Sequence, residues 1–376
     1  MKRKLLIAGI TLSLLCGCSA KEKTTSTKIT TYSNTSMNEV FDTVYSFTEY
    51  TDSESKGKKH YNDSLDTLTK CNQLFDIYND YDGVNNLKTI NDNAGIAPVE
   101  VDPLIIDMLK RAKDFYDLSE GEFDVTQGAL LKVWHKYREE GIALNEKDEK
   151  GDLPAEEELE EAAIHSGWDK IEINEDNSTV YITDPDVSLD VGGIAKGYAA
   201  EVAGKQAEED GMKAGFLNVG RNIRLVGNKT DGSDWRIGIA DPSGLYTNGI
   251  VTIDLKNPVS VVTSGDYERY YIAKDGNRYA HIIDPSTLYP ATLYRSVSIM
   301  TKDSGDADCL STALFTMTKE EGMKLISDYE SETGNEVKVI WVTTEDKRQG
   351  KDDHQVGDLY VSYTDNLEGD LTWPNS

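Results

Sequence analysis

Strand-like segments follow one another between residues 215 and 299, whereas helical patterns dominate before and after this stretch. The segments are rich in β-branched and aromatic residues and are bounded by Gly, Pro, Asn and Asp. They read GFLNVG, NIRLVG, DWRIGIA, IVTIDL, PVSVVTSG, YYIAKDGNRYAHII and SVSIM. The order is neither a strict alternation of strands and helices nor all-β, and no repeat of fixed period is visible. The chain is therefore predicted to be an α+β protein, with mixed or antiparallel sheets and helices packed outside them.

Apolar residues at helical spacing predict helices over 61–76 and 101–118. The second of these begins with Asp102 and Pro103, an N-cap residue followed by a first-turn proline. A strand is expected over 37–50, and 170–173 with 179–182 should form a hairpin. Further helices are expected near 84–91, after 127, over 155–165, after the glycines at 192–193, and over 307–317 and 319–329.

Acidic residues outnumber basic ones by 67 to 39, which gives the 376-residue chain a formal net charge of −28. Nucleic-acid binding needs a net basic face, so this charge argues against a nucleic-acid partner. A small phosphate ligand remains compatible if a metal ion or a helix N-terminus supplies local positive charge. The length corresponds to one large or two ordinary domains.

The N-terminus has the pattern of an exported protein. Three basic residues precede an apolar stretch that ends in Leu15-Cys16-Gly17-Cys18, a lipobox-like sequence. We expect residues 1–17 to be a signal peptide, Cys18 to be lipidated and residues 18–36 to be a flexible tether. The protein would then be anchored to the extracytoplasmic face of the cell membrane. A plain secretory signal or an uncleaved anchor are the alternatives.

Two cysteines, Cys71 and Cys309, remain in the part that is expected to fold. In an exported protein they could form one disulfide, but neither belongs to a metal-type pair. We expect both to be buried thiols.

Residues 189–203 (LDVGGIAKGYAAEVA) place Asp190 at the end of a strand, then Gly192 and Gly193, then a helix with Lys196 in its first turn. Adjacent glycines let a ligand approach the backbone, and a helix N-terminus with a lysine attracts anions. This segment therefore predicts an anion site, unless it is only a tight strand-to-helix turn.

Three other segments carry candidate chemistry. Residues 263–271 (TSGDYERYY) form a turn before an aromatic run, which could equally be strand packing. His281 lies at a strand end beside Asp284-Pro285, where a structural histidine is the alternative. Asp308 and Thr312 share one helix face, and this pair of oxygen ligands suits a hard cation such as Mg²⁺. An Asp N-cap and a space-filling Thr would explain the same pair without a metal.

Taken together, these segments resemble the FAD:protein FMN transferase family, the ApbE-type flavin transferases. The resemblance runs from about Phe41 to Val342. Phe41 stands where many members have Met, LNVGRNIR replaces an Asn-Ala-Gly-Gly-Asp run, and Leu288 replaces a common Gly. The matching segments are FDTVYSFTEY, FDIYNDYDGVNNLKTINDNAG, EGEFDVTQG, LDVGGIAKGYA, LNVGRNIRLVG, TSGDYERYY, HIIDPSTLYP and ADCLSTALF.

The resemblance implies transfer of FMN from FAD to a Ser or Thr hydroxyl of a target protein, with release of AMP. It implies that Mg²⁺ is held by Asp308, Thr312 and the carbonyl of Gly193. His281 would be the general base, with an imidazole pKa close to its ordinary value. The residues that the resemblance places against FAD are Phe41, Tyr78, Glu122, Phe123, Asp124, Asp190, Lys196 and Ile283.

The resemblance further implies an ApbE-like (T-fold-like) flavin transferase domain over residues 37–345. The acceptor expected from the family is an exported electron-transfer protein with a short Ser/Thr-containing motif. Residues 346–376 form a C-terminal extension that adds an edge strand or stays loose. Two alternatives to FMN transfer remain: a lipoprotein that binds FAD without turnover, and a pyrophosphatase that cleaves FAD to FMN and AMP.

Overall fold

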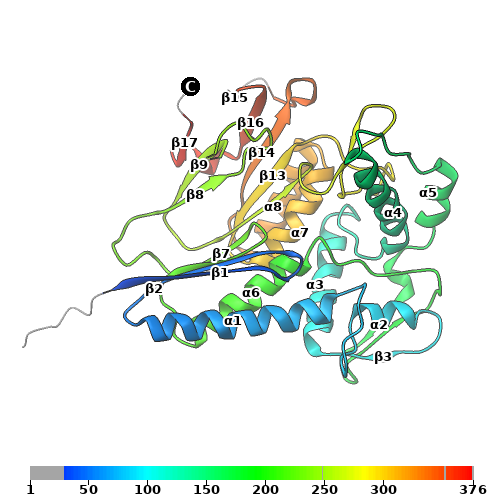
Figure 1. Cartoon of the computed structure of the whole chain (residues 1–376), viewed down its shortest axis with the longest axis horizontal. Coiled ribbons are helices and arrows are strands. Elements are labelled where there is room, and N and C mark those ends of the chain that lie inside the picture. The colour runs from blue at the N-terminus through cyan, green and yellow to red at the C-terminus, as the bar shows by residue number, and fades with distance from the viewer. Residues whose placement is uncertain (1–28, 248, 351–352, 375–376) are drawn as a thin grey trace, which may run out of the picture.

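The computed structural model describes residues 29–247, 249–350 and 353–374, and its main element is a nine-stranded sheet (Figure 1). Every neighbouring pair in this sheet is antiparallel. The α+β class with an antiparallel sheet is thereby confirmed. In spatial order the strands are β1 (Thr30–Val40), β2 (Thr43–Thr51), β6 (Gly215–Val219), β7 (Asn222–Val226), β10 (Ser260–Gly265), β13 (Ser296–Thr301), β14 (Lys338–Thr344), β16 (Leu359–Tyr363) and β15 (His354–Val356).

Helices cover one face of this sheet. The helices α1 (Glu54–Phe75), α6 (Ala195–Glu209) and α7 (Ser304–Thr316) contact one another in that order and contact the strands beneath them, as Figure 1 shows. The helix α8 (Lys319–Thr333) follows α7, and its buried side chains belong to the same apolar core. Because side chains alternate along a strand, Val226, Val262 and Val339 point into this core while their neighbours point to the other face.

The opposite face is covered by a small second sheet. It contains β8 (Trp235–Ile239), β9 (Val251–Leu255) and β17 (Leu371–Thr372), and its side chains meet Leu225, Val261 and Ile340 of the large sheet. The strands β15, β16 and β17 and the short helices η2 (Glu345–Lys347) and η3 (Asp365–Leu367) belong to the C-terminal extension. The extension was expected either to add an edge strand or to stay loose. In the structure, β15 is an edge strand of the large sheet and β17 is an edge strand of the small one.

A third group of elements lies beside the large sheet. It contains a sheet of β3 (Val99–Glu100), β5 (Thr179–Ile182) and β4 (Ile171–Asn174), in that order, and a two-stranded ribbon. As expected, Asp102 caps a helix by accepting a hydrogen bond from the Leu104 N–H at 3.0 Å. The remaining elements are α2 (Leu87–Asp92), α3 (Pro103–Leu118), α4 (Gly128–Asn145), α5 (Glu156–Ala163), η1 (Trp168–Lys170), β11 (Tyr271–Ile272) and β12 (Arg278–Tyr279).

The N-terminal part of the fold differs from the prediction in two ways. The segment expected to be one strand is the end of β1, a turn and β2, with Phe41 and Asp42 both left-handed at φ 51° and 49°. The tether predicted to reach residue 36 is wrong for 30–36, because β1 begins at Thr30 and pairs with β2. β1 is an edge strand that pairs with β2 through backbone hydrogen bonds, and only its Ser36 and Val40 side chains are buried. Most of its residues are therefore polar, and the sequence looks like that of a linker.

The predicted signal peptide and Cys18 lie outside the described residues. Cys71 on α1 and Cys309 on α7 are buried free thiols, as expected. In the described ranges, none of the helices combines the length and the apolar character needed to cross a membrane.

Candidate active site

All of the predicted flavin-site residues line one cavity of about 420 Å³. This volume is within the range of pockets that hold small ligands and cofactors. The residues come from the β1–β2 turn, the loop after α1, the α3–α4 loop, the segment that leads into α6, the loop after β12 and the helix α7. They are Phe41, Tyr78, Glu122, Phe123, Asp124, Asp190, Gly193, Lys196, His281, Ile283, Asp308 and Thr312.

The glycine turn before α6 forms one wall of the cavity. Asp190 is fixed at the start of this turn, because its Oδ1 accepts a hydrogen bond from the Gly192 N–H at 2.9 Å. A side chain at position 193 would bring its Cβ to 3.0 Å from the Phe123 ring and 3.1 Å from Thr312 Oγ1. A larger side chain would push Phe123 or Thr312 away, so glycine favours this close approach of the turn to α7. The turn into α6 is where it was predicted, but the strand expected before it was wrong, because β5 ends at Ile182 and Asp190 lies in the loop between β5 and α6. The anion site at this turn stays a prediction.

The helix α7 meets this turn through Asp308, which is 4% exposed. Its Oδ2 accepts a hydrogen bond from the Gly197 N–H at 2.8 Å and lies 3.9 Å from Lys196 Nζ. Burial raises the pKa of Asp308, although Lys196 and the Gly197 N–H act in the opposite direction. A cation bound at the other oxygen, Oδ1, would stabilise the ionised form of this buried carboxylate.

The donor set at this point fits a hard cation. In the described part of the chain, neither Asp308 Oδ1 nor Thr312 Oγ1 has a hydrogen bond to protein, and both residues line the cavity beside Gly193. A carboxylate, a hydroxyl and a backbone carbonyl are the oxygen ligands that Mg²⁺ takes in proteins. The three residues predicted to hold the metal are therefore adjacent and chemically suited to it.

His281 lies on another side of the cavity and is surrounded by cations. Burial, and after it the charges of Arg138, Arg269 and Lys196, together lower its pKa to about 3. The expectation of an ordinary imidazole pKa was wrong, because the sequence shows neither the burial of the ring nor the three charges near it. His281 is therefore neutral at physiological pH. Its Nδ1 is buried and has no hydrogen-bond partner in the described structure, which packing alone does not explain.

The aromatic and acidic walls complete the cavity. Tyr78 is 60% exposed and its ring lies 5.5 Å from that of His135. The Phe41 N–H donates a hydrogen bond to Asn72 Oδ1 at 2.7 Å, which holds the left-handed turn in place. Glu122 accepts a hydrogen bond from Thr316 Oγ1 at 2.7 Å. Burial raises the pKa of Glu122 and that of Asp124, so this wall has carboxyl groups of weakened acidity.

The sequence analysis missed Arg138 and Arg269, which line the same cavity. Arg269 belongs to the segment TSGDYERYY, in which only the tyrosines were considered. Two of those tyrosines are packing residues: Tyr271 is fully buried, and Tyr270 lies under the Arg278 guanidinium. The third, Tyr267, accepts a hydrogen bond from Arg221 Nη1 at 2.6 Å. Arg138 lies three residues after His135 on α4, and this helical spacing could have placed both side chains on one face.

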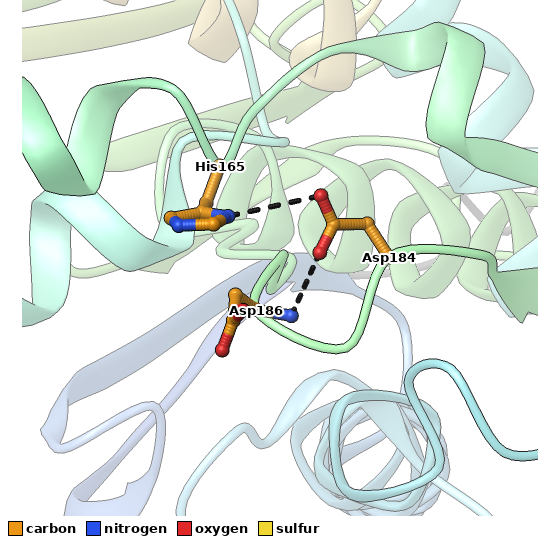
Figure 2. A group of neighbouring side chains, drawn as sticks. All are labelled: His165, Asp184 and Asp186. Atoms are coloured by element: carbon orange, nitrogen blue, oxygen red, sulfur yellow. Dashed lines mark hydrogen bonds and ion pairs between the residues drawn. The ribbon is translucent and has the colours of Figure 1, made fainter.

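A second group of potential metal ligands lies outside the cavity. Figure 2 shows His165 beside Asp184, with Nδ1 at 3.7 Å from Oδ2, and Asp186 nearby. Lys170 Nζ also lies 3.7 Å from Asp184 and donates hydrogen bonds to two backbone carbonyls after α5. These contacts join the end of α5 to the loop after β5, so the group has a structural explanation.

The fold is α+β, and the site is a cavity of about 420 Å³ that brings together a glycine turn, acidic and basic side chains and a histidine. The sequence model of the ApbE family matches residues 41–335, and the chain belongs to this family. The FAD:protein FMN transferase of Treponema pallidum is 32% identical over 257 residues, which are 65% of this chain and 68% of that protein. The Vibrio cholerae enzyme of the same name is 29% identical over 76% of this chain and 81% of its own length.

Solved structures agree with this assignment. The ApbE protein of Thermotoga maritima superposes with a TM-score of 0.69 and 32% identity, covering 83% of this chain and 94% of that one. The flavin transferase ApbE of Vibrio cholerae gives a TM-score of 0.70 at 23% identity, over 90% and 99% of the two chains, and shows the same fold.

Proposed function

We propose that this chain is an FAD:protein FMN transferase that is anchored by lipid to the extracytoplasmic face of the cell membrane. It takes FAD and joins FMN to a Ser or Thr hydroxyl of an exported electron-transfer protein, with Mg²⁺ as cofactor. The family membership and the named relatives support the activity. The observation with most weight is that residues from six separate segments converge on one cavity, with a cation-binding donor set beside a neutral histidine.

The reaction exchanges the phosphoanhydride bond of the FAD diphosphate for a phosphoester bond to the acceptor. The acceptor oxygen forms a bond to the phosphorus on the FMN side of FAD, and the bond from that phosphorus to the bridging oxygen breaks. AMP leaves with that oxygen and the electron pair. The hydroxyl proton passes to the neutral imidazole of His281 and from there to solvent.

Asp308, Thr312 and the Gly193 carbonyl would hold Mg²⁺, which neutralises charge on the diphosphate when it is bound. Lys196, in the first turn of α6, adds positive charge next to the same carboxylate. Alignment of the diphosphate is the main task of such a site, because phosphoryl transfer depends on positioning and charge neutralisation. Tyr78 and Phe41 offer aromatic surface to the flavin ring, and Glu122, Phe123, Asp124, Asp190 and Ile283 line the rest of the FAD path.

An in-gel flavin fluorescence assay tests this proposal. The purified protein is incubated with FAD, Mg²⁺ and an exported acceptor that contains a Ser/Thr flavinylation motif. We expect a fluorescent acceptor and one AMP for each flavin transferred, and we expect chelator to abolish both. Intact bound FAD would indicate storage, and AMP without labelled acceptor would indicate a pyrophosphatase. Either result, or full transfer in chelator, would contradict the proposal.

The membrane anchor rests on the N-terminal sequence and is tested separately. A Cys18→Ser variant expressed in a bacterial host is expected in the medium or the soluble exported fraction, whereas the unchanged chain is expected with membranes. Equal distribution of the two proteins would contradict lipidation at Cys18.

A further inference from the structure

Two arginines without an assigned role lie in the same cavity as His281. Arg138 belongs to α4, and Arg269 belongs to the loop between β10 and β11. Both guanidinium charges act on His281 and on Asp190, so both lie near these two residues in the cavity. Lys196, by contrast, acts on His281 and Asp308. Lys196 is therefore the cation next to the proposed metal ligand, whereas the two arginines are near His281 and Asp190.

Neither arginine has a close carboxylate partner. Arg138 Nη2 contacts His135 Nδ1 at 2.8 Å, and its Nε lies 3.9 Å from the exposed Glu139. For Arg269, the described residues include no ion pair. Buried arginines elsewhere in the molecule are paired closely: Arg224 lies 3.1 Å from Glu201 and Arg295 lies 2.8 Å from Asp266. Within the described residues, Arg138 and Arg269 thus lack the short ion pairs that neutralise Arg224 and Arg295.

Holding the two charges near each other costs free energy in the free protein. The Arg138 side chain is only 12% exposed, and its Nε is buried without a hydrogen bond. Burial and the neighbouring Arg269 both lower the pKa of Arg138. The counter-charges that act on Arg138 are Glu139, which is exposed and 3.9 Å away, and Asp190, which accepts its hydrogen bond from the Gly192 N–H. An anion between the two guanidinium groups would relieve the repulsion and satisfy the free donors.

We infer that Arg138 and Arg269 bind the phosphate on the FMN side of FAD and hold its non-bridging oxygens during transfer. This inference rests on the proposed function and adds two substrate-binding residues to it. The guanidinium group matches phosphate geometry with two parallel donors, and it keeps its charge at every physiological pH. Lys196 lies beside Asp308, where the metal would be held, so the arginines add positive charge to the phosphoryl group beyond what that pair supplies. The same placement puts the attacked phosphorus next to His281.

Binding of FMN and of riboflavin without a metal isolates this contact. The two ligands differ by the phosphate alone, and chelator removes the contribution of Mg²⁺. We expect the unchanged protein to bind FMN about ten- to a hundredfold more tightly than riboflavin, as measured by flavin fluorescence. In Arg138→Gln and Arg269→Gln this preference should fall toward equality, while riboflavin affinity stays the same. Arg269 is exposed, so its substitution leaves the fold intact.

Turnover provides the second measurement. With FAD, Mg²⁺ and acceptor, each Gln variant is expected to lose about a hundredfold or more in kcat, and Arg269→Lys to recover part of it. Arg236→Gln is the matched control, because Arg236 is an exposed arginine on β8 that pairs with Asp254 away from the cavity. It should keep both the FMN preference and kcat.

The outcomes separate this inference from the proposed function. If the unchanged protein transfers FMN but the Gln variants keep their FMN preference and kcat within twofold, the arginines do not bind the phosphate. A rise in acceptor KM alone would assign them to the acceptor and would also overturn the inference. If the unchanged protein transfers no FMN, the proposed function fails, whereas a loss of FMN preference in the variants would still support the phosphate contact.

Discussion

Burial controls the charge of single residues in the cavity. Asp190, Asp308, Glu122 and Asp124 all have raised pKa values because they are removed from water. His281 shows the converse, because burial and nearby cations favour its neutral form. A carboxylate with a raised pKa gains most from a bound cation, and a neutral imidazole keeps a nitrogen lone pair for a proton. These two effects support different roles for Asp308 and His281 in one reaction.

Replacement of His281 tests its role as a base. We expect His281→Gln to lower kcat for FMN transfer by about a hundredfold or more while FAD affinity changes little. Stopped assays of labelled acceptor give kcat, and flavin fluorescence gives the FAD dissociation constant. His165→Gln, at a partly exposed histidine outside the cavity, is the control and should leave both values unchanged. Similar losses in kcat and in FAD affinity would contradict the assignment.

The pH dependence follows from the lowered pKa of His281. A base must be unprotonated to act, and with a pKa of about 3 this imidazole stays neutral in the free protein throughout pH 5–8. The kcat/KM for FAD should therefore show no acid limb near pH 6.5, where an ordinary histidine would be protonated. If kcat/KM instead fell below about pH 6.5 in the unchanged protein but not in His281→Gln, the pKa of His281 would be close to that of an ordinary histidine. That result would contradict the lowered pKa.

At the scale of elements, the site depends on how closely α6 approaches α7. A Cβ at Gly197 would lie 2.3 Å from the Ser304 carbonyl oxygen and 2.5 Å from Asp308 Cβ. Glycine at this position therefore sets the spacing between the two helices. It also lets the backbone N–H reach the carboxylate that is proposed to hold the metal.

Gly197→Ala should disturb both stability and metal use. Overpacking is expected to lower the free energy of unfolding by about 1–3 kcal/mol. Displacement of Asp308 is expected to raise the Mg²⁺ concentration for half-maximal transfer by about tenfold or more. Denaturant titration and Mg²⁺ titration measure the two effects. In the control Gly322→Ala on α8, the Cβ meets only the end of the Leu314 side chain, at 2.8 Å, and Mg²⁺ dependence should be unchanged. An unaltered Mg²⁺ requirement in Gly197→Ala would contradict the proposed metal site.

The elements that the sequence predicted well are those with a strong periodic pattern. The helix α3 was located with its cap because Asp102-Pro103 precedes a clear apolar stripe. The β1–β2 hairpin was missed because Phe41 and Asp42 adopt left-handed conformations that usually require Asn or Gly, so the turn has no sequence signal. Local pattern singled out the glycine turn with Lys196, His281 and the Asp308–Thr312 pair, whereas family resemblance supplied the aromatic and acidic walls of the cavity. Arg138 and Arg269 were missed because they are far apart in the sequence and come close to His281 only in the folded chain.

At the scale of the whole molecule, the large sheet has a different role on each face. On one face, α6 and α7 pack against the sheet and supply residues of the cavity. The opposite face is covered by β8, β9 and the C-terminal extension. The family model ends at residue 335, and none of the cavity residues belongs to the extension. The extension should therefore contribute to stability and leave the chemistry unaffected.

A matched pair of leucines tests this division. Leu367 in η3 is fully buried in the core formed by the extension, whereas Leu245 is 70% exposed. We expect Leu367→Ala to lower the free energy of unfolding by about 2–5 kcal/mol, because it leaves a cavity in a packed core. Leu245→Ala should change it by less than about 0.5 kcal/mol. Both variants should keep the kcat for FMN transfer at 25 °C, measured well below their melting temperatures. If Leu367→Ala were as stable as Leu245→Ala, the extension would contribute little to the fold. If it folded normally but lost transfer, the extension would be coupled to the cavity across the sheet, and the two faces would not be independent.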